Sequence, residues 1–176
     1  PGTGNLTNYI IKKNPKKIYV VEKDKALSSL LCKKFENKIN IINDDILEVS
    51  ENLISKRKLI VFGNLPYNIS TEILSKWIVS IKNNFWFSEL ILMFQKEVAD
   101  RIIAKDNTPS YGRLSILSNW KLDVKRIMNI SPNSFFPKPK IKSSLLFFSP
   151  KHKFFKIKNP KNLEMITRIF FNQRRK

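Results

Sequence analysis

Residues 64–67, with the sequence Asn-Leu-Pro-Tyr, form the stretch of the chain best suited to chemistry. They follow a short apolar run, residues 59–62, that is typical of a buried strand, and Gly63 is expected to end that strand. Pro66 has no backbone N–H and disfavours a helical conformation at Leu65. The sequence therefore predicts a sharp turn at the carboxyl end of a strand, the edge at which open α/β sheets bind their ligands.

The predicted turn would present three different groups to a ligand. Asn64 supplies an amide oxygen, Leu65 a backbone carbonyl, and Tyr67 an aromatic face. Two hydrogen-bond acceptors beside a stacking surface suit a flat ring that carries an amino group, such as adenine. The alternative is an ordinary strand-to-helix turn that contains a Pro-Tyr pair by chance.

A second set of residues suits the binding of a nucleoside. Gly2 and Gly4 lie in a turn before an apolar helical stretch, and glycines there let a backbone pass close to a ligand. Glu22 ends a β-branched run, residues 18–22, about 20 residues after the glycines, which is the interval at which dinucleotide-binding folds place a ribose-binding acid. A plain loop and a solvated acid at a strand end are the alternatives.

Two acidic residues follow the next apolar run, residues 39–42. Asp44 or Asp45 could accept a hydrogen bond from an adenine amino group, or could simply form an Asx turn or a helix cap.

Cys32 is the only cysteine, which excludes an internal disulfide and a cysteine-based metal site.

The loop at residues 134–140 has the composition of a nucleic-acid contact. It contains Phe135 and Phe136, two prolines, and the basic residues Lys138 and Lys140. Exposed rings beside lysines can stack on an unpaired base while the charges hold its backbone. We expect one of the two phenylalanines to anchor the loop to the core instead.

Strands and helices alternate along most of the chain, which predicts an α/β fold with a mostly parallel sheet. The last two strands have no helix between them and are expected to pair as a hairpin, so that the last strand is antiparallel. The expected strands are 18–22, 39–42, 59–62, 85–94, 121–130 and 143–148, and the expected helices are 25–37, 70–81, 95–105, 113–120 and 162–176.

The charge balance is strongly basic, with 33 Lys and Arg residues against 14 Asp and Glu and a formal net charge of +19. Such an excess indicates a polyanionic partner, either nucleic acid or an acidic membrane surface, although an AT-rich genome would also enrich lysine. No apolar run approaches a membrane span, and the start is unlike a signal peptide. The lone Cys32 fits a cytoplasmic location, which we expect. The two ends of the sequence suggest a fragment, with one domain at residues 1–150 and the start of another at 151–176.

Several stretches together resemble the ribosomal RNA small-subunit adenine dimethyltransferases, a family that methylates the exocyclic amine of adenosine with S-adenosylmethionine. The stretches that match are residues 1–7, 20–22, 64–71, 93–102, 111–115, 136–144 and 171–176. The four residues 64–67 alone are shared by many amino-methyltransferases, whereas the whole set in this order is specific.

The resemblance implies a Rossmann-like class I methyltransferase sheet whose first strand would precede Pro1, followed by the start of a small helical C-terminal domain. It implies that Gly2 and Gly4 line the methionine end of the cofactor and that Glu22 holds the ribose hydroxyls. It also favours Asp45 over Asp44 for the adenine amino group of the cofactor. The residues implied to bind the target adenine and its RNA are Asn64, Leu65, Tyr67, Phe136, Lys138 and Lys140, and Asn64 would contact the cofactor as well.

The implied reaction is the dimethylation of two adjacent adenosines near the 3′ end of small-subunit (16S) ribosomal RNA, by a monomer that needs no metal and no membrane. One alternative is the related macrolide-resistance family, which methylates large-subunit (23S) RNA. Another is a transcription-factor relative that binds nucleic acid without methyl transfer. A third is a DNA amino-methyltransferase, although those enzymes usually begin the four-residue motif with Asp or Ser rather than Asn.

Overall fold

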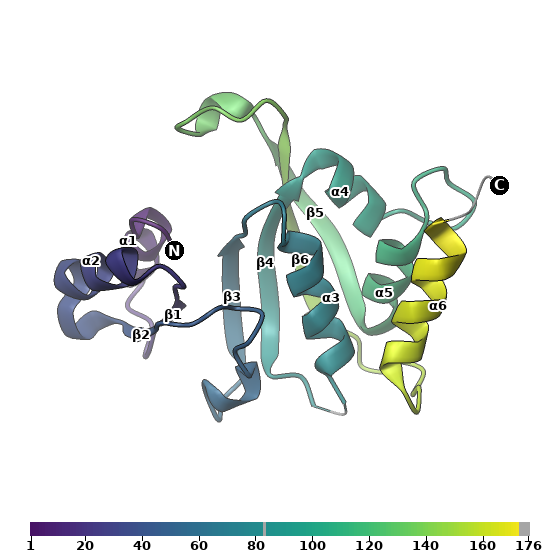
Figure 1. Ribbon diagram of the computed structural model, residues 1–176, viewed down its shortest axis with the longest axis horizontal. Helices are drawn as coiled ribbons and strands as arrows, with labels where there is room; N and C mark the ends of the chain where they lie inside the picture. Colours follow the sequence, from purple (N-terminus) through teal and green to yellow (C-terminus); the bar gives the residue numbers. More distant parts are fainter. Residues whose placement is uncertain (83, 173–176) are drawn as a thin grey trace. The chain divides into compact units, whose positions relative to one another are not determined.

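A computed structural model of the chain describes residues 1–82 and 84–172 (Figure 1). The chain forms two compact units, Pro1–Lys56 and Arg57–Lys176. Each unit has its own sheet, and each is described separately below. The final residues of the predicted helix 162–176, and of the matching stretch 171–176, lie outside the described residues.

The first unit is a small α/β layer. Its strands β1 (Tyr19–Val21) and β2 (Asn40–Ile42) are parallel and are connected by helix α2 (Lys25–Phe35). Its other elements are α1 (Asn5–Ile11) and two short 3-10 helices, η1 (Glu36–Lys38) and η2 (Glu51–Leu53). The buried core consists of Val20, Leu31, Phe35 and Ile39, with Ile11, Ile18 and Ile41 packed against it.

Asp24 and Gly4 explain how the two longer helices of this unit begin. Asp24 caps α2, because its carboxylate accepts a hydrogen bond from the Leu27 N–H at 2.8 Å. Gly4 precedes α1 in a left-handed conformation, with φ of +81°. A Cβ atom at this position would lie 2.5 Å from the Phe35 ring and 2.8 Å from Leu31, so the packing of α2 itself requires a glycine here.

The second unit contains a four-stranded sheet with the order β3-β4-β6-β5. Strands β3 (Leu59–Asn64) and β4 (Phe87–Gln95) are parallel, whereas β6 (Ser143–Pro150) is antiparallel both to β4 and to β5 (Leu122–Ile130). The predicted mostly parallel sheet with an antiparallel last strand is therefore confirmed. The prediction that Gly63 ends its strand is wrong, because β3 continues through Gly63 and Asn64, which pair with Leu92 and Met93.

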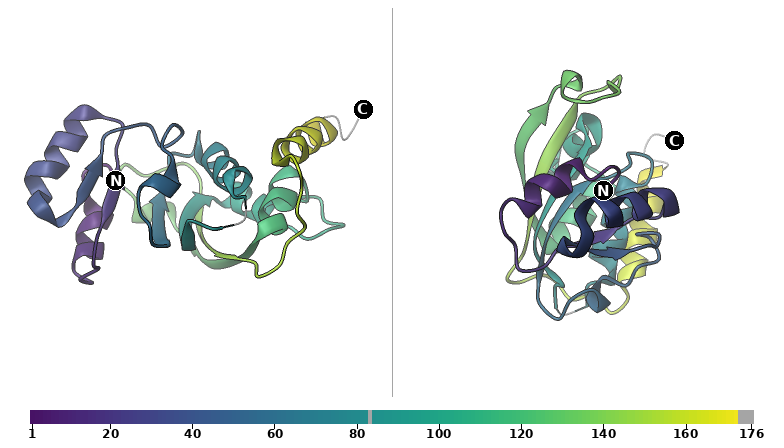
Figure 2. Two further views of the ribbon diagram at one scale, coloured as in Figure 1. Left: turned by 90° about the horizontal axis from the view of Figure 1, so that it is seen from below. Right: turned by 90° about the vertical axis from the view of Figure 1, so that its left-hand side faces the viewer.

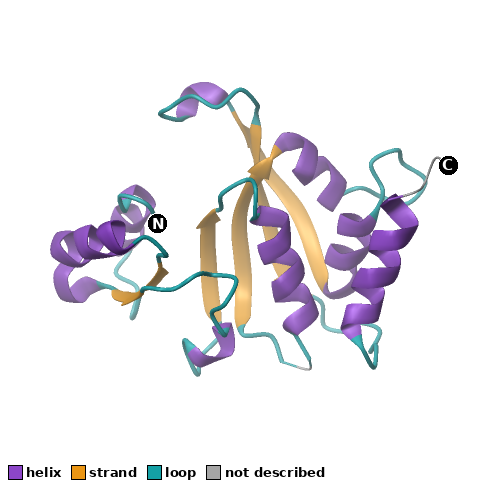
Figure 3. Ribbon diagram, in the orientation of Figure 1, coloured by secondary structure: helices purple, strands orange, loops and turns teal. Residues whose placement is uncertain are grey.

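Helices cover the sheet of the second unit and complete its core (Figure 3). They are α3 (Ser70–Ser80), α4 (Lys96–Ile102), α5 (Arg113–Lys121) and α6 (Pro160–Asn172), and a 3-10 helix, η3 (Pro132–Ser134), lies in the loop after β5. Helices α3, α5 and α6 contact one another (Figures 1 and 2). Strand β4 is covered on both faces near its end, because the consecutive residues Leu92, Met93 and Phe94 are all buried.

One charged side chain lies inside this core. Lys121, at the end of α5, is 1% exposed, and its ammonium donates hydrogen bonds to the carbonyls of Ile78 and Ile81 at the end of α3. The same nitrogen lies 3.8 Å from the centre of the Trp120 ring. Burial lowers the pKa of Lys121 to about 8. The lysine therefore caps the carboxyl end of α3 from within the protein.

The segment between β6 and α6 packs against other parts of the second unit. The Trp120 indole donates to the Phe155 carbonyl at 2.6 Å, and Phe154 packs edge-on against Phe85 and Trp120. A domain boundary near residue 150 stays a prediction.

No helix within residues 1–82 and 84–172 is long and apolar enough to cross a membrane. The same residues contain no cluster of three His, Cys, Asp or Glu side chains able to hold a metal ion.

Candidate functional site

The turn after β3 presents Asn64 at the carboxyl end of the strand. Asn64 is the last residue of β3 and is exposed. A Cβ atom at Gly63 would lie 2.8 Å from the Leu92 side chain and 3.0 Å from that of Leu65, so the glycine allows both leucines to pack against the strand. The Pro66 carbonyl then accepts the Ile69 N–H at 3.2 Å, which leads the chain into α3.

Tyr67 is held at both ends. Its hydroxyl lies 2.6 Å from the Ser143 hydroxyl, with either oxygen able to donate, and its backbone carbonyl accepts a hydrogen bond from the Ser70 hydroxyl at 3.1 Å. The ring itself is half-buried. The predicted stacking residue therefore has a defined position next to Asn64 and Leu65.

The loop between β5 and β6 projects beyond the ends of the strands (Figure 1). Phe135 is half-buried, whereas Phe136 is fully exposed, as expected if one ring anchors the loop and the other stays available. Lys138 and Lys140 are also exposed. The Phe136 ring is thus accessible to a ligand, and its stacking on a base stays a prediction.

Apart from Asn64, the residues proposed to bind the cofactor lie in the first unit, where Glu22 directly follows β1. One carboxylate oxygen accepts the Gly2 N–H at 3.3 Å and lies 3.6 Å from the Pro1 nitrogen, and the other accepts the Asp24 N–H at 3.0 Å. Gly2 has a φ of +57°, and no atom lies within 4 Å of the place where its Cβ would be. The glycine turn is thus tied to the acid while one side of Gly2 stays open.

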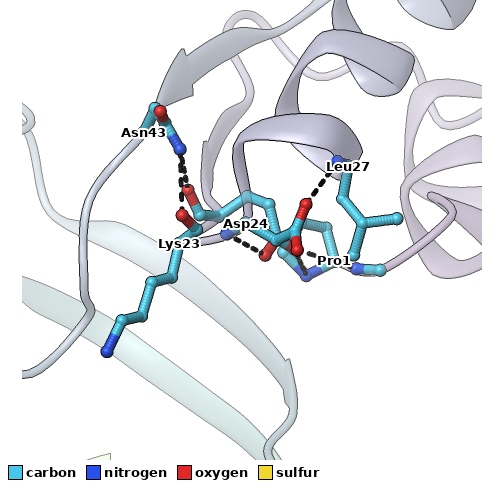
Figure 4. A network of polar contacts seen from close by, with 7 residues as sticks. Pro1, Lys23, Asp24, Leu27 and Asn43 are labelled. Carbon is cyan, nitrogen blue, oxygen red and sulfur yellow. Dashed lines mark hydrogen bonds and ion pairs between the residues drawn. The ribbon is translucent and has the colours of Figure 1, made fainter.

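Asn43 directly follows β2 and connects the ends of both strands in this unit. The sequence-based prediction gave this residue no role. Its amide nitrogen donates to the carbonyls of Glu22, at 2.7 Å, and Lys23, at 3.3 Å (Figure 4). Its position in the sequence, directly after a predicted strand and directly before two acids, could have indicated this role. The residue matters because it fixes the backbone that carries Glu22.

Asp44 and Asp45 use their carboxylates differently. Asp44 accepts the N–H of Asp45 at 2.7 Å, whereas Asp45 accepts the N–H of Leu47 at 2.9 Å and the Lys23 ammonium at 2.8 Å. The hydrogen bond that Lys23 donates to Asp45 raises the pKa of Lys23. The Asx turn considered as an alternative is thus present at Asp45, and the cofactor role of this acid stays a prediction.

The hydrogen-bond acceptors of the first unit nevertheless fit S-adenosylmethionine. Ribose hydroxyls and an adenine amino group are hydrogen-bond donors, and Glu22 and Asp45 place acceptors after two adjacent parallel strands. A carboxylate has about four acceptor positions, so the contacts described above leave Glu22 room for a further donor. Glu22 would hold the ribose, Asp45 the adenine amino group, and Gly2 and Gly4 the methionine end.

An Asp45→Asn substitution tests this assignment in the full-length protein. It keeps an oxygen for the Leu47 N–H but removes the charge, so we expect S-adenosylmethionine to bind roughly tenfold more weakly. Isothermal titration calorimetry would measure the affinity, with Asp44→Asn as the matched control that changes it less than about twofold. A loss confined to Asp44→Asn would assign the cofactor contact to Asp44 instead.

Comparison with known proteins places these features in one family. The profile of the family described as "Ribosomal RNA adenine dimethylase" matches residues 1–176. The chain is 70% identical over 176 residues to "Ribosomal RNA small subunit methyltransferase A" of Pelagibacter ubique (strain HTCC1062), covering all of the chain and 67% of that protein. It is 43% identical over 185 residues to the protein of the same name from Wolbachia sp. subsp. Drosophila simulans (strain wRi), covering 65% of it. The chain therefore spans about two thirds of the length of these curated relatives.

Solved structures agree with this fold. A dimethyladenosine transferase from Plasmodium falciparum matches with a TM-score of 0.74 and 28% identity, covering 99% of this chain and 62% of that one. The 23S rRNA methyltransferase ErmE matches with a TM-score of 0.72 and 19% identity, covering 98% of this chain and 68% of that one, and at this identity it shows the fold alone. Because the family profile matches residues 1–176, the chain belongs to the ribosomal RNA adenine dimethylase family.

Proposed function

We propose that the protein containing this chain transfers methyl groups from S-adenosylmethionine to two adjacent adenosines near the 3′ end of small-subunit ribosomal RNA. The observation that carries this proposal is the turn after β3, where exposed Asn64 lies beside Leu65 and a Tyr67 ring fixed at both ends. The 70% identity to a ribosomal RNA small subunit methyltransferase supports this choice of RNA. A cytoplasmic location and a monomeric state are part of the same proposal.

The proposed chemistry depends on orientation. The sulfonium of the cofactor supplies an activated methyl group, while the exocyclic nitrogen of adenine is a poor nucleophile because its lone pair is delocalised into the ring. The Asn64 amide oxygen and the Leu65 carbonyl would each accept one of its two hydrogens, which favours a tetrahedral nitrogen and directs the lone pair at the methyl group. The proton leaves after transfer, so no strong general base is required.

The same two acceptors would select the base. Guanine carries an oxygen where adenine carries its amine, and that oxygen has no hydrogen to donate. Burying an acceptor without a donor costs about 1–3 kcal/mol, so Asn64 and Leu65 disfavour guanine. The reacting adenine has to be unpaired or flipped out of a helix to reach them.

The RNA itself would be held by charge and by stacking. The net charge of +19 favours binding to a polyanion, and Lys138 and Lys140 lie exposed on the projecting loop beside Phe136. Phosphate contacts of this kind raise affinity for any RNA, whereas the ring would contact an unpaired base.

A Phe136→Ala substitution tests the stacking role. Because the ring is fully exposed, we expect no loss of stability, and roughly tenfold weaker kcat/KM on small-subunit particles, since base stacking on an aromatic contributes about 1–3 kcal/mol. Steady-state assays and thermal denaturation would measure the two effects. Phe135→Ala is the matched control, because loss of this half-buried ring should lower the melting temperature. Unchanged kinetics in Phe136→Ala would remove the residue from the RNA interface.

The proposed substrate is tested with the full-length protein and radiolabelled S-adenosylmethionine. We expect methyl transfer to unmethylated 30S particles, with dimethyladenosine recovered from two adjacent positions of 16S RNA. Transfer to 23S RNA alone would instead support the macrolide-resistance reaction. Cellular function that survives Asn64→Ala would support a role in nucleic-acid binding without methyl transfer.

A further inference from the structure

Ser143 makes a contact that couples the two halves of the proposed RNA site. It is the first residue of β6, it is fully buried, and its hydroxyl lies 2.6 Å from the Tyr67 hydroxyl. The two residues are 76 positions apart in the chain. A hydrogen bond between two hydroxyls at this distance is short and well formed.

The position of Ser143 is itself strongly determined. It pairs with Gln95 at the end of β4 and with Ile130 at the end of β5, so strands on both sides hold its backbone. The neighbouring Lys142 carbonyl accepts the Lys96 N–H at 2.9 Å. A side chain anchored in this way can define the orientation of a ring that bonds to it.

The Tyr67 ring is oriented through its hydroxyl, which contacts Ser143. The Ser70 hydroxyl holds only the backbone carbonyl of Tyr67, which leaves rotation about the side-chain bonds. The Ser143 contact removes this freedom and also uses hydrogen-bonding capacity of the phenol. Tyr67 would then meet its ligand with the face of its ring.

We propose that Ser143 is a positioning residue for the target adenine, acting through the Tyr67 hydroxyl. The inference rests on the proposed function, because it assumes that Tyr67 stacks on the base that is methylated. Ser143 also directly follows the loop that carries Phe136, Lys138 and Lys140. The residue thus links the Tyr67 ring to the base of the RNA-binding loop.

The chain supplies a matched control in the next residue. Ser144 is also fully buried and also lies on β6, but its hydroxyl donates to the Asn129 side chain at 2.7 Å. Successive residues of a strand point to opposite faces, so Ser144→Ala removes an equivalent hydroxyl away from Tyr67.

The experiment is a double-mutant cycle in the full-length protein on unmethylated 30S particles. We expect Ser143→Ala and Tyr67→Phe each to lower kcat by roughly tenfold with little change in KM, because a small displacement of a positioning group costs up to about a hundredfold. The double variant should be no slower than either single variant, since both break the same hydrogen bond. Ser144→Ala should keep wild-type kinetics.

Three outcomes would overturn the inference. They are wild-type kcat in Ser143→Ala, wild-type kcat in Tyr67→Phe, and multiplicative losses in the double variant, which would mean that Ser143 acts on the fold and not through the phenol. Tyr67→Phe leaves β6 unaltered, so it tests the hydrogen bond even where Ser143→Ala does not fold. A wild-type protein without activity on 30S particles would contradict the proposed function instead, and calorimetry of S-adenosylmethionine binding would separate that result from a misfolded preparation.

Discussion

Replacing Asn64 with alanine is expected to lower kcat for methyl transfer by about a hundredfold, the effect of removing one preorganised hydrogen-bonding group from a reacting centre. The amide oxygen would be lost where the adenine amine needs an acceptor, while the Leu65 carbonyl would remain. Because Asn64 is exposed, the melting temperature should not change. Single-turnover assays on 30S particles would isolate the methyl-transfer step from RNA binding and product release.

The control for Asn64 is Asn52, an exposed asparagine in η2. Asn52→Ala changes composition in the same way and should keep wild-type rates. The cofactor affinity of Asn64→Ala gives a second readout, because Asn64 is also predicted to contact the cofactor. A variant that transfers methyl groups at the wild-type rate would show that this turn does not bind the reacting amine.

Replacing Lys121 with alanine is expected to reduce the free energy of unfolding by about 3 kcal/mol. The substitution leaves a cavity beside Trp120 and removes the donor to the carbonyls of Ile78 and Ile81. Urea denaturation monitored by circular dichroism would measure the change. A loss below about 0.5 kcal/mol, the range of surface substitutions, would contradict the role of Lys121 as an internal cap of α3.

The buried ammonium also makes stability depend on pH. The pKa of Lys121 is about 8 in the folded protein, against 10.5 for an unperturbed lysine. Between these values the unfolded chain binds a proton that the folded chain has released, so the free energy of unfolding rises with pH from about 8 to 10.5. Below pH 8 both states are protonated, and the unfavourable burial of the charge is present in full.

Comparison with variants isolates this contribution from the other titrating groups. Between pH 7 and pH 9.5, wild type should gain roughly 1–2 kcal/mol of stability relative to Lys121→Ala, from the linkage of one shifted lysine. Lys121→Met fills the same volume without an ionisable group and should follow the alanine variant in its pH dependence. Parallel pH profiles for wild type and Lys121→Met would show that Lys121 keeps an ordinary pKa.

Local signals in the sequence were sufficient for much of the fold. Alternation of apolar runs with amphipathic stretches predicts the helices and strands, and the missing helix before residues 143–148 predicts the antiparallel strand that the structure contains. Pro66 restricts the turn after β3 through its own covalent geometry, and the apolar run 59–62 indicates the strand, so a turn that presents Asn64 near a strand end is predictable from local sequence.

Local reasoning failed where a residue depends on partners distant in the chain. Gly63 has the residue type of a strand terminator, yet its backbone pairs with Leu92 within β3, and a side chain at this position would collide with that of Leu92. Lys121 has the type of a solvated residue, and only the packing of α5 against α3 buries it. Neither environment has a signature in the neighbouring sequence.

By itself, the sequence determined the family, the order of the elements and the chemical types of the groups that would bind an adenine and its methyl donor. Only the tertiary structure decided which of these groups are held in place, because hydrogen bonds such as Tyr67 to Ser143 join residues 76 positions apart. A strand pattern shows which residues alternate between faces, but the register between strands sets which side chains meet. The contact between the turn after β3 and the first residue of β6, directly after the loop that carries Phe136, therefore becomes visible only in the folded sheet.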